Sequence, residues 1–195
     1  MCGRFANSES IPVIAGRWAA GIAEGAADWQ PSDDIRPSQR IPVLLEDAAR
    51  PRRLGLMTWG WTRDFARSSL LINARSEDAA QKPTFSAALR RRRCLVPATT
   101  WFEWQEVAGS AKKLKRSLQP EGLETWALAG IWEPSVASDG RKSAAVVLLT
   151  TASHPSIAQV HDRMPCIIPA VQATAWLTGS SAQKDLLRPL AAVFT

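Results

Sequence analysis

The residue that follows the initiator methionine could carry out a covalent reaction. Methionine is normally removed when the next residue is as small as Cys2, and its removal would leave an α-amine and a thiol on adjacent carbons. An aldehyde condenses with such a 1,2-aminothiol to an imine, and the thiol then closes a five-membered thiazolidine ring. Ordinary pKa values, about 7.7 to 8.0 for the amine and about 8.5 for the thiol, leave both groups usable near neutral pH. A cysteine that stands at position 2 by chance is the alternative.

A carboxylate lies among aromatic residues in the segment 93–104, whose sequence is RCLVPATTWFEW. If this segment is a strand, alternation places Glu103 on the same face as Trp101 and on the opposite face from Phe102 and Trp104. Apolar surroundings raise the pKa of a carboxyl group and suit it to proton transfer. A glutamate paired with one of the many arginines is the alternative.

Two further polar groups follow apolar or helical segments. Asn73 and Arg75 come directly after Leu-Leu-Ile, and His161 begins the sequence HDRMP after a predicted helix. Asparagine both donates and accepts hydrogen bonds, arginine can hold a phosphate with two donors, and histidine exchanges a proton near neutral pH. A structural histidine beside a proline turn is the alternative.

The elements that must position these residues are short. The sequence predicts strands at residues 41–46, 54–59, 93–97, 101–107, 125–132 and 144–151, and short helices at 83–92, 155–160, 171–178 and 182–187. The polar, lysine-rich segment 109–122 is predicted to be a mobile hairpin loop. Because strands and helices do not alternate regularly, we expect one α+β domain, residues 1–195, around a curved sheet.

Charge and aromatic content are compatible with a polyanionic partner. The formal net charge is +6, and basic residues cluster at 90–93 and at 112–116. Nine tryptophans, in a chain without tyrosine, offer flat surfaces on which unpaired bases could stack. The alternative is that the tryptophans are core residues and the charges a solvated face.

Other features narrow the class of protein. No apolar run of about 18 residues is present and the N-terminal stretch is polar, so we expect a soluble, cytoplasmic protein without a membrane partner, associated with the nucleoid if bacterial. Three cysteines and two histidines without metal-ligand spacing predict neither a metal nor another cofactor. Cys94 and Cys166 are interpreted as free thiols in the core.

Taken together, the motifs resemble those of the SOS response-associated peptidase (SRAP) family, also called abasic site processing proteins. The matching segments, in chain order, are MCGRF at 1–5, RPSQ at 36–39, WG at 59–60, NARSE at 73–77, the segment 93–104, AGIW at 129–132 and HDRMP at 161–165. The resemblance implies a barrel-like mixed sheet with flanking short helices. It also implies a positively charged groove for single-stranded DNA.

The chemistry implied by the resemblance is a thiazolidine crosslink between Cys2 and the ring-opened sugar of an abasic site, which would protect the lesion during the DNA damage response. Asn73 would position the N-terminal residue and the sugar. Glu103 would transfer protons during imine formation. His161 would protonate the sugar oxygen during ring opening and assist reversal of the adduct. The name "peptidase" reflects self-removal of Met1. Lyase or crosslink-reversal activity is a further expectation. The protein is expected to be a monomer.

The resemblance also implies DNA contacts. Arg75 and Arg163 would hold phosphates beside the lesion, with Arg4 as an additional cation, and Trp104 and Phe65 are the aromatic candidates. The family usually has WG(L/I)PSW where this chain has WGWTRDF at 59–65. The glycine and tyrosine that usually precede the site glutamate are replaced here by threonine and phenylalanine at 100 and 102.

Two other functions compete with this one. An N-terminal-cysteine amidotransferase also begins with Met-Cys-Gly, although that resemblance ends after three residues and no oxyanion site is visible. A noncatalytic module that binds single-stranded DNA through basic loops and aromatic residues is the second alternative.

Overall fold

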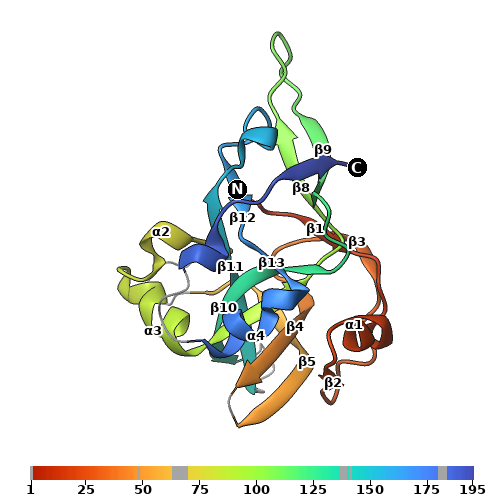
Figure 1. The fold of residues 1–195 in the computed structure, drawn as a ribbon, viewed down its shortest axis with the longest axis vertical. Helices are drawn as coiled ribbons and strands as arrows, with labels where there is room; N and C mark the ends of the chain where they lie inside the picture. The colour runs from red at the N-terminus through yellow and green to blue at the C-terminus, as the bar shows by residue number, and fades with distance from the viewer. Residues whose placement is uncertain (1, 48, 63–69, 137–139, 141, 180–183) are drawn as a thin grey trace.

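A computed structural model describes residues 2–47, 49–62, 70–136, 140, 142–179 and 184–195. In this part of the chain, strands predominate and the helices are short (Figure 1). The strands are β1 (Phe5–Asn7), β2 (Gly21–Ile22), β3 (Ser32–Ile35), β4 (Arg40–Asp47), β5 (Arg50–Trp59), β6 (Asn73–Arg75), β7 (Arg93–Pro97), β8 (Thr100–Gln105), β9 (Leu114–Pro120), β10 (Trp126–Val136), β11 (Lys142–Ala152), β12 (Arg163–Pro165), β13 (Ile167–Pro169) and β14 (Ala192–Phe194). The helices are α1 (Ile11–Arg17), α2 (Ser76–Ala79), α3 (Pro83–Arg91) and α4 (Ala173–Thr178), with 3-10 helices η1 (Pro155–Ile157), η2 (Ala170–Gln172) and η3 (Lys184–Leu187). None of the helices in the described ranges is both long and apolar enough to cross a membrane.

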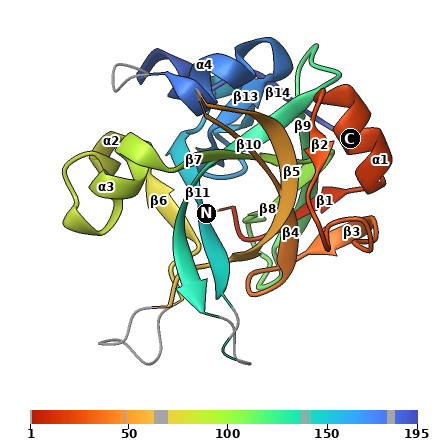
Figure 2. The same ribbon diagram turned by 90° about the horizontal axis from the view of Figure 1, so that it is seen from below.

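The larger sheet closes on itself. Its strands follow the order β12-β11-β10-β7-β4-β5-β2, and β11 also pairs in parallel with β5, through the partners Ala145–Thr58 and Val146–Trp59. The strands β11, β10, β7, β4 and β5 therefore form a barrel, and Figure 2 shows them around the first residues of the chain. A second sheet, in the order β14-β9-β8-β1-β3, extends from it (Figure 1).

Two cores follow from strand alternation. In β7, Cys94 and Val96 belong to the cluster that also contains Cys2, whereas Leu95 packs in a second cluster with residues of α1, α3 and α4. The helices therefore cover the outside of the barrel. Buried aromatic rings from distant segments, such as Phe5 and Trp59 with centroids 5.3 Å apart, contribute to the first cluster. Cys2, the residue expected to react, thus lies just before β1, which is anchored in a packed core.

At two glycines of the quoted motifs, Gly60 and Gly130, a side chain would clash with a neighbouring residue. Gly60 has φ +117°, and a Cβ there would lie 2.7 Å from the Leu70 side chain. A Cβ on Gly130 would lie 2.8 Å from the sulfur of Cys94 and 3.0 Å from Val146. Gly130 therefore lets β10 approach β7 and β11 closely, and Gly60 provides a positive φ and the space that the Leu70 side chain occupies.

The predicted α+β class and the curved, barrel-like sheet with short flanking helices are confirmed. Strands occur at each predicted position, and the segment 93–97 has the predicted bounds. The prediction of a loop throughout 109–122 is wrong, because Leu114–Pro120 forms β9 and pairs with β8. The polar composition concealed this strand, in which Leu118 is buried and the Lys115 ammonium lies 3.7 Å from the centroid of the Phe102 ring.

Candidate functional site

Cys2 is held inside the barrel rather than displayed on the surface. Its side chain has no exposed area, and its sulfur lies 3.9 Å from the carbonyl oxygen of Arg4. The Asn73 amide donates a hydrogen bond of 2.8 Å to the Cys2 carbonyl oxygen. Burial raises the pKa of the Cys2 thiol, and the charge of Glu103 acts in the same direction. The thiol therefore stays protonated and needs a base to become a nucleophile.

Asn73 and Arg75 are placed by one short strand. β6 pairs in parallel with β11, through Leu148–Asn73 and Thr150–Arg75. Residues 73 and 75 share a face of this strand, while Ala74 is buried on the other side. Arg75 is exposed, and no described residue forms an ion pair with it. A cation is thus available beside the asparagine that orients Cys2.

Glu103 is the buried carboxyl group of this site. It lies in β8 between β1 and β9, and only 2% of the residue is exposed. Burial raises the pKa of Glu103 from its ordinary value of 4.5 to about 7, and the charge of Asp162 also raises it. At neutral pH, the protonated and ionised forms are therefore both populated. Such a group can donate a proton in one step and accept one in the next.

His161 stands just before β12, and the charge of its neighbour Asp162 acts on the Glu103 carboxyl group. The His161 Nδ1 accepts a hydrogen bond of 2.9 Å from the backbone N–H of Arg163, and Asp162 Oδ1 lies 2.8 Å from the same nitrogen. The two contacts require different protonation states, because only a protonated Nδ1 pairs with the carboxylate. Burial lowers the pKa of His161, as do the charges of Lys113 and Arg163, while Asp162 opposes them. The neutral ring, with its proton on Nε2, is therefore favoured at neutral pH.

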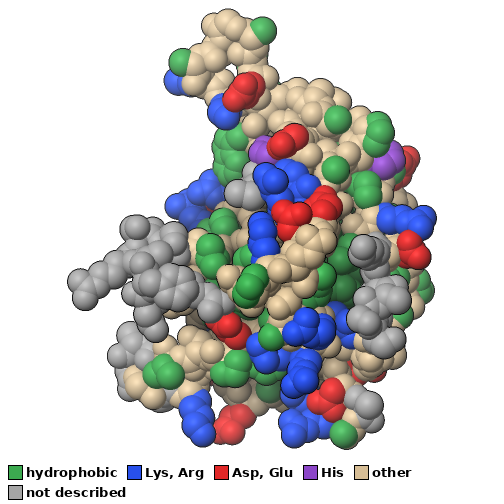
Figure 3. Space-filling model, turned by 90° about the vertical axis from the view of Figure 1, so that its left-hand side faces the viewer, with side chains coloured by type: hydrophobic (Ala, Val, Ile, Leu, Met, Phe, Trp, Pro, Cys, Tyr) green, Lys and Arg blue, Asp and Glu red, His purple; other side chains and the backbone are tan. Residues whose placement is uncertain are grey.

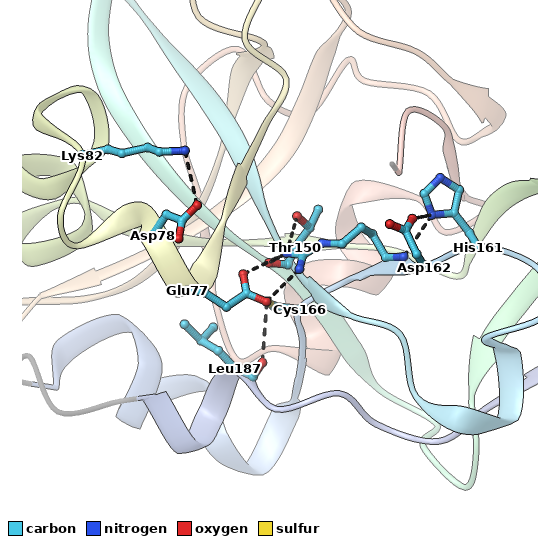
Figure 4. A network of polar contacts seen from close by, with 9 residues as sticks. Glu77, Asp78, Lys82, Thr150, His161, Asp162, Cys166 and Leu187 are labelled. Carbon is cyan, nitrogen blue, oxygen red and sulfur yellow. Dashed lines mark hydrogen bonds and ion pairs between the residues drawn. The ribbon is translucent and has the colours of Figure 1, made fainter.

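Arg163 is engaged within the protein. Its guanidinium donates to both carboxylate oxygens of Glu77, at 2.7 and 2.9 Å, and to the Thr150 carbonyl oxygen at 2.6 Å. In the view of Figure 4, Thr150 lies between Glu77 on one side and His161 and Asp162 on the other. The Arg163 hydrogen bond lowers the pKa of Glu77 to about 2. The ion pair therefore joins α2 to β12 and persists across the physiological pH range.

Two of the remaining sequence-predicted DNA contacts, Arg4 and Trp104, lie on the β8 side. Arg4 forms a 2.8 Å ion pair with Asp34, and its guanidinium carbon lies 5.3 Å from the centroid of the Trp104 ring. Trp104 and His161 line one hollow of about 290 Å³. Phe65 lies outside the described residues. Trp104 and Arg4 thus form one wall beside the histidine, and any role of Phe65 stays a prediction.

The four residues expected to do chemistry are linked in the structure, His161 only through its neighbour Asp162. Asn73 contacts Cys2 directly, Glu103 acts electrostatically on Cys2, and the neighbour of His161, Asp162, acts on Glu103. Sequence analysis gave no role to Glu77 or Asp162. Both stand inside quoted motifs, at 73–77 and 161–165, and an acid in each motif was the signal that could have identified them.

Comparison with known proteins assigns the family. The family model described as "SOS response associated peptidase (SRAP)" matches residues 1–194. The chain belongs to the SRAP family. Among SRAP relatives, the chain is 29% identical over 194 residues to abasic site processing protein YoaM of Bacillus subtilis, covering 97% of this chain and 85% of that protein. It is 25% identical over 189 residues to YedK of Escherichia coli, also named an abasic site processing protein, with coverage of 95% and 83%.

More distant proteins agree with this assignment. Abasic site processing protein HMCES of Xenopus tropicalis is 28% identical over 234 residues, covering 96% of this chain and 69% of HMCES. A crystal structure of a protein from Bacteroides thetaiotaomicron matches with a TM-score of 0.83 at 19% identity, covering 99% of this chain and 91% of that one. One from Bordetella bronchiseptica matches with a TM-score of 0.80 at 21% identity, with coverage of 100% and 99%. These crystal structures share the SRAP fold described above.

Proposed function

We propose that this SRAP protein processes abasic sites in single-stranded DNA by forming a thiazolidine crosslink through Cys2 once Met1 has been removed. The SRAP relatives named above are abasic site processing proteins, which supports the substrate. The observation that carries the chemistry is the hydrogen bond from Asn73 to the Cys2 carbonyl, next to a buried carboxyl group with a pKa near 7. The crosslink shields the lesion until it is repaired.

The proposed reaction joins the two components with loss of one water. The Cys2 amine adds to C1′ of the ring-opened abasic sugar, and the resulting hydroxyl leaves as water when it receives a proton, giving an imine. The imine forms in its protonated iminium state, the thiol sulfur adds to its carbon, and the thiol proton passes to the carboxylate that donated the first proton. The product is a five-membered ring that contains both the nitrogen and the sulfur of Cys2.

Glu103 serves both proton transfers in this scheme. In its protonated form it donates to the departing hydroxyl, and the carboxylate that remains accepts the thiol proton for ring closure. Burial raises the pKa of Glu103 to about 7 and raises that of the Cys2 thiol by more, so transfer of the thiol proton to the carboxylate must accompany the attack of the sulfur on carbon. Asn73 limits rotation of the residue that carries both reacting atoms.

His161 acts on the sugar rather than on the amine. The closed sugar must open before its aldehyde is exposed, and ring opening requires a proton on the ring oxygen. The imidazolium form, whose Nδ1–H pairs with Asp162, can donate its Nε2 proton to the ring oxygen, and the neutral ring that remains accepts the Arg163 amide at Nδ1. His161 assists reversal of the crosslink by the opposite proton transfer. The proposal also includes two accessory activities, strand cleavage by a lyase reaction and self-removal of Met1.

DNA is held by cations and rings around this pocket. Arg75 offers an exposed guanidinium on the same strand as Asn73, which suits a phosphate next to the lesion. Trp104 and Arg4 form the opposite wall. Arg163 contributes through the position that it gives to His161, since its donors are shared with Glu77 and Thr150. A monomer suffices for this arrangement.

The test is a denaturing gel of mature protein mixed with an oligonucleotide that carries one abasic site. We expect a slowly migrating adduct with the wild type and with Cys166→Ala, a control that removes a buried thiol elsewhere. Cys2→Ala should give no durable adduct, and Cys2→Ser only a weaker one. An equally durable adduct with Cys2→Ala would refute the linkage. Binding without any adduct in the wild type would instead favour the noncatalytic module, and glutamine hydrolysis the amidotransferase.

A further inference from the structure

Arg93 is a buried arginine whose charge no described residue neutralises. Only 9% of the residue is exposed, and no hydrogen bond or ion pair from the described residues reaches its guanidinium. Strand alternation turns Arg93 to the same side as Leu95, where its guanidinium carbon lies 5.5 Å from the centroid of the Trp176 ring. Trp176 is itself fixed by a 2.8 Å hydrogen bond from its indole N–H to the Cys94 carbonyl oxygen. The charge is therefore held in place without a counterion from the part of the chain that the structure describes.

Two partly buried arginines near Arg93 are satisfied within the protein, unlike Arg93 itself. Arg52 donates to Glu46, to the Trp18 carbonyl oxygen and to Thr174, all within 2.9 Å. Arg92, the sequence neighbour of Arg93, donates to the Trp132 carbonyl oxygen at 3.0 Å. Burying a charge without a partner costs several kcal/mol or more, so natural proteins rarely leave one in this state. The missing partner is expected to come from a ligand.

The hollow in front of Arg93 has the charge and size to bind an anionic ligand. It measures about 240 Å³ and is lined by three more arginines, Arg53 from β5 and Arg90 and Arg91 from the last turn of α3. None of these three forms an ion pair with a described residue. Lys and Arg side chains gather on the lower half of the face seen in Figure 3, which is the side that α3 occupies in Figure 1.

The acidic groups of this hollow are already engaged. Glu46 forms a 2.8 Å ion pair with Arg52, and Asp47 Oδ1 accepts a 3.0 Å hydrogen bond from the Ala49 amide. The last turns of α3 and α4 also border the hollow, and Arg90 and Arg91 offset their partial negative charge. A second hollow beside Arg93, of about 200 Å³, contains Glu77. An anion would therefore favour the first hollow.

We propose that this hollow binds a phosphate group, with Arg93 as the buried anchor and Arg53, Arg90 and Arg91 around it. Guanidinium groups that approach from three elements suit a tetrahedral oxyanion such as phosphate. A carboxylate needs only the two parallel N–H donors of a single arginine. The phosphate is either a phosphodiester of a longer nucleic acid strand or a free phosphate or phosphomonoester. The proposal does not depend on crosslinking at Cys2.

Thermal unfolding tests the site directly. At about five times its dissociation constant, inorganic phosphate should raise the Tm of the wild type by roughly 2 to 4 °C relative to chloride at equal ionic strength. Arg93→Met should lose this specific gain. In phosphate-free buffer it should also be more stable than the wild type, because an uncompensated charge is gone, whereas loss of a merely structural arginine would lower the Tm. Lys112→Gln, on the exposed β8–β9 turn, is the matched charge control and should respond like the wild type.

Phosphate also stabilises proteins by general exclusion, so the difference between variants is the measure. Equal responses of the wild type and Arg93→Met would overturn the proposal. If Arg93→Met does not fold, the double variant Arg90→Gln/Arg91→Gln, on the exposed side of α3, takes its place and should show a reduced response.

Oligonucleotides without a lesion distinguish the sources of the phosphate. If the double variant binds a 20-nucleotide thymidine strand several-fold more weakly than the wild type, but a 6-nucleotide strand equally well, the ligand is a phosphodiester of a longer strand. Unchanged binding of both strands, with the phosphate response lost, identifies a free phosphate or phosphomonoester.

Discussion

Replacing Glu103 by glutamine should make the protein more stable at alkaline pH. Burial raises the pKa of Glu103 from 4.5 to about 7 in the folded chain. Between these two pH values, the folded state keeps a proton that the unfolded state has released. Stability therefore falls as the pH rises through this window and levels off above about pH 7. At about 1.4 kcal/mol per pH unit, the wild type loses about 3 kcal/mol of its free energy of unfolding between acidic pH and pH 8. The glutamine variant has no titrating group at this position and would not lose this stability.

Urea denaturation between pH 4.5 and 8.5 measures this effect. The free energy of unfolding of Glu103→Gln minus that of the wild type should grow by about 3 kcal/mol across the range, because only the wild type carries the titrating group. Glu106→Gln is the matched control, since Glu106 is exposed and its ion pair with Lys113 lowers its pKa instead. A difference that stays constant from pH 4.5 to 8.5 would show that Glu103 does not titrate near neutral pH.

The same variant should be impaired in function. General acid-base assistance is typically worth about 10²- to 10⁴-fold, so Glu103→Gln should form adducts more slowly by a factor in this range at pH 7, measured in a single turnover. A more stable but slower protein would identify Glu103 as a group retained for chemistry at the expense of stability. A wild-type rate in the stabilised variant would remove Glu103 from the proton transfers.

Two further predictions concern DNA binding and the sugar. Noncovalent affinity should fall with salt, with a single-strand slope of about 0.7 per phosphate contact, and Arg75→Ala should lower both affinity and slope more than Lys112→Ala. A salt-independent affinity of the wild type between dilute and physiological buffer argues against phosphate contacts. His161→Ala should slow capture of the closed sugar and also release from a preformed crosslink, measured by single-turnover capture and by competitor chase. Loss of only one of these rates would contradict a shared proton transfer.

Much of the fold could be predicted from local sequence. The segment 93–97 was predicted with its observed bounds. Its apolar residues follow a basic run and end at a proline, and all five residues are buried in the barrel wall. The predicted helix at 83–92 ends one residue earlier, at Arg91. Proline fixed its beginning, since proline is favoured in the first turn of a helix. Apolar runs and turn residues therefore carried this information.

Closure of the barrel could not be predicted in the same way. The parallel pairing of Thr58 and Trp59 with Ala145 and Val146 joins residues more than eighty positions apart, and no local pattern encodes it. β9 was missed because its exposed face is basic, so that its composition resembles a loop. The burial of Arg93 was missed for the opposite reason, since a run of four arginines at 90–93 indicates a solvated face.

The candidate site was predicted as a set of residues but not as a network. The motifs at 73–77 and 161–165 flank β11, which pairs with β6 and with β12. The Glu77–Arg163 ion pair joins the same two motifs through their side chains. Because the backbone N–H of Arg163 also holds Nδ1 of His161, the position of the histidine depends on an acid four residues after Asn73. Glu77 and Arg163 thus fix the distance between the asparagine that holds Cys2 and the histidine assigned to the sugar.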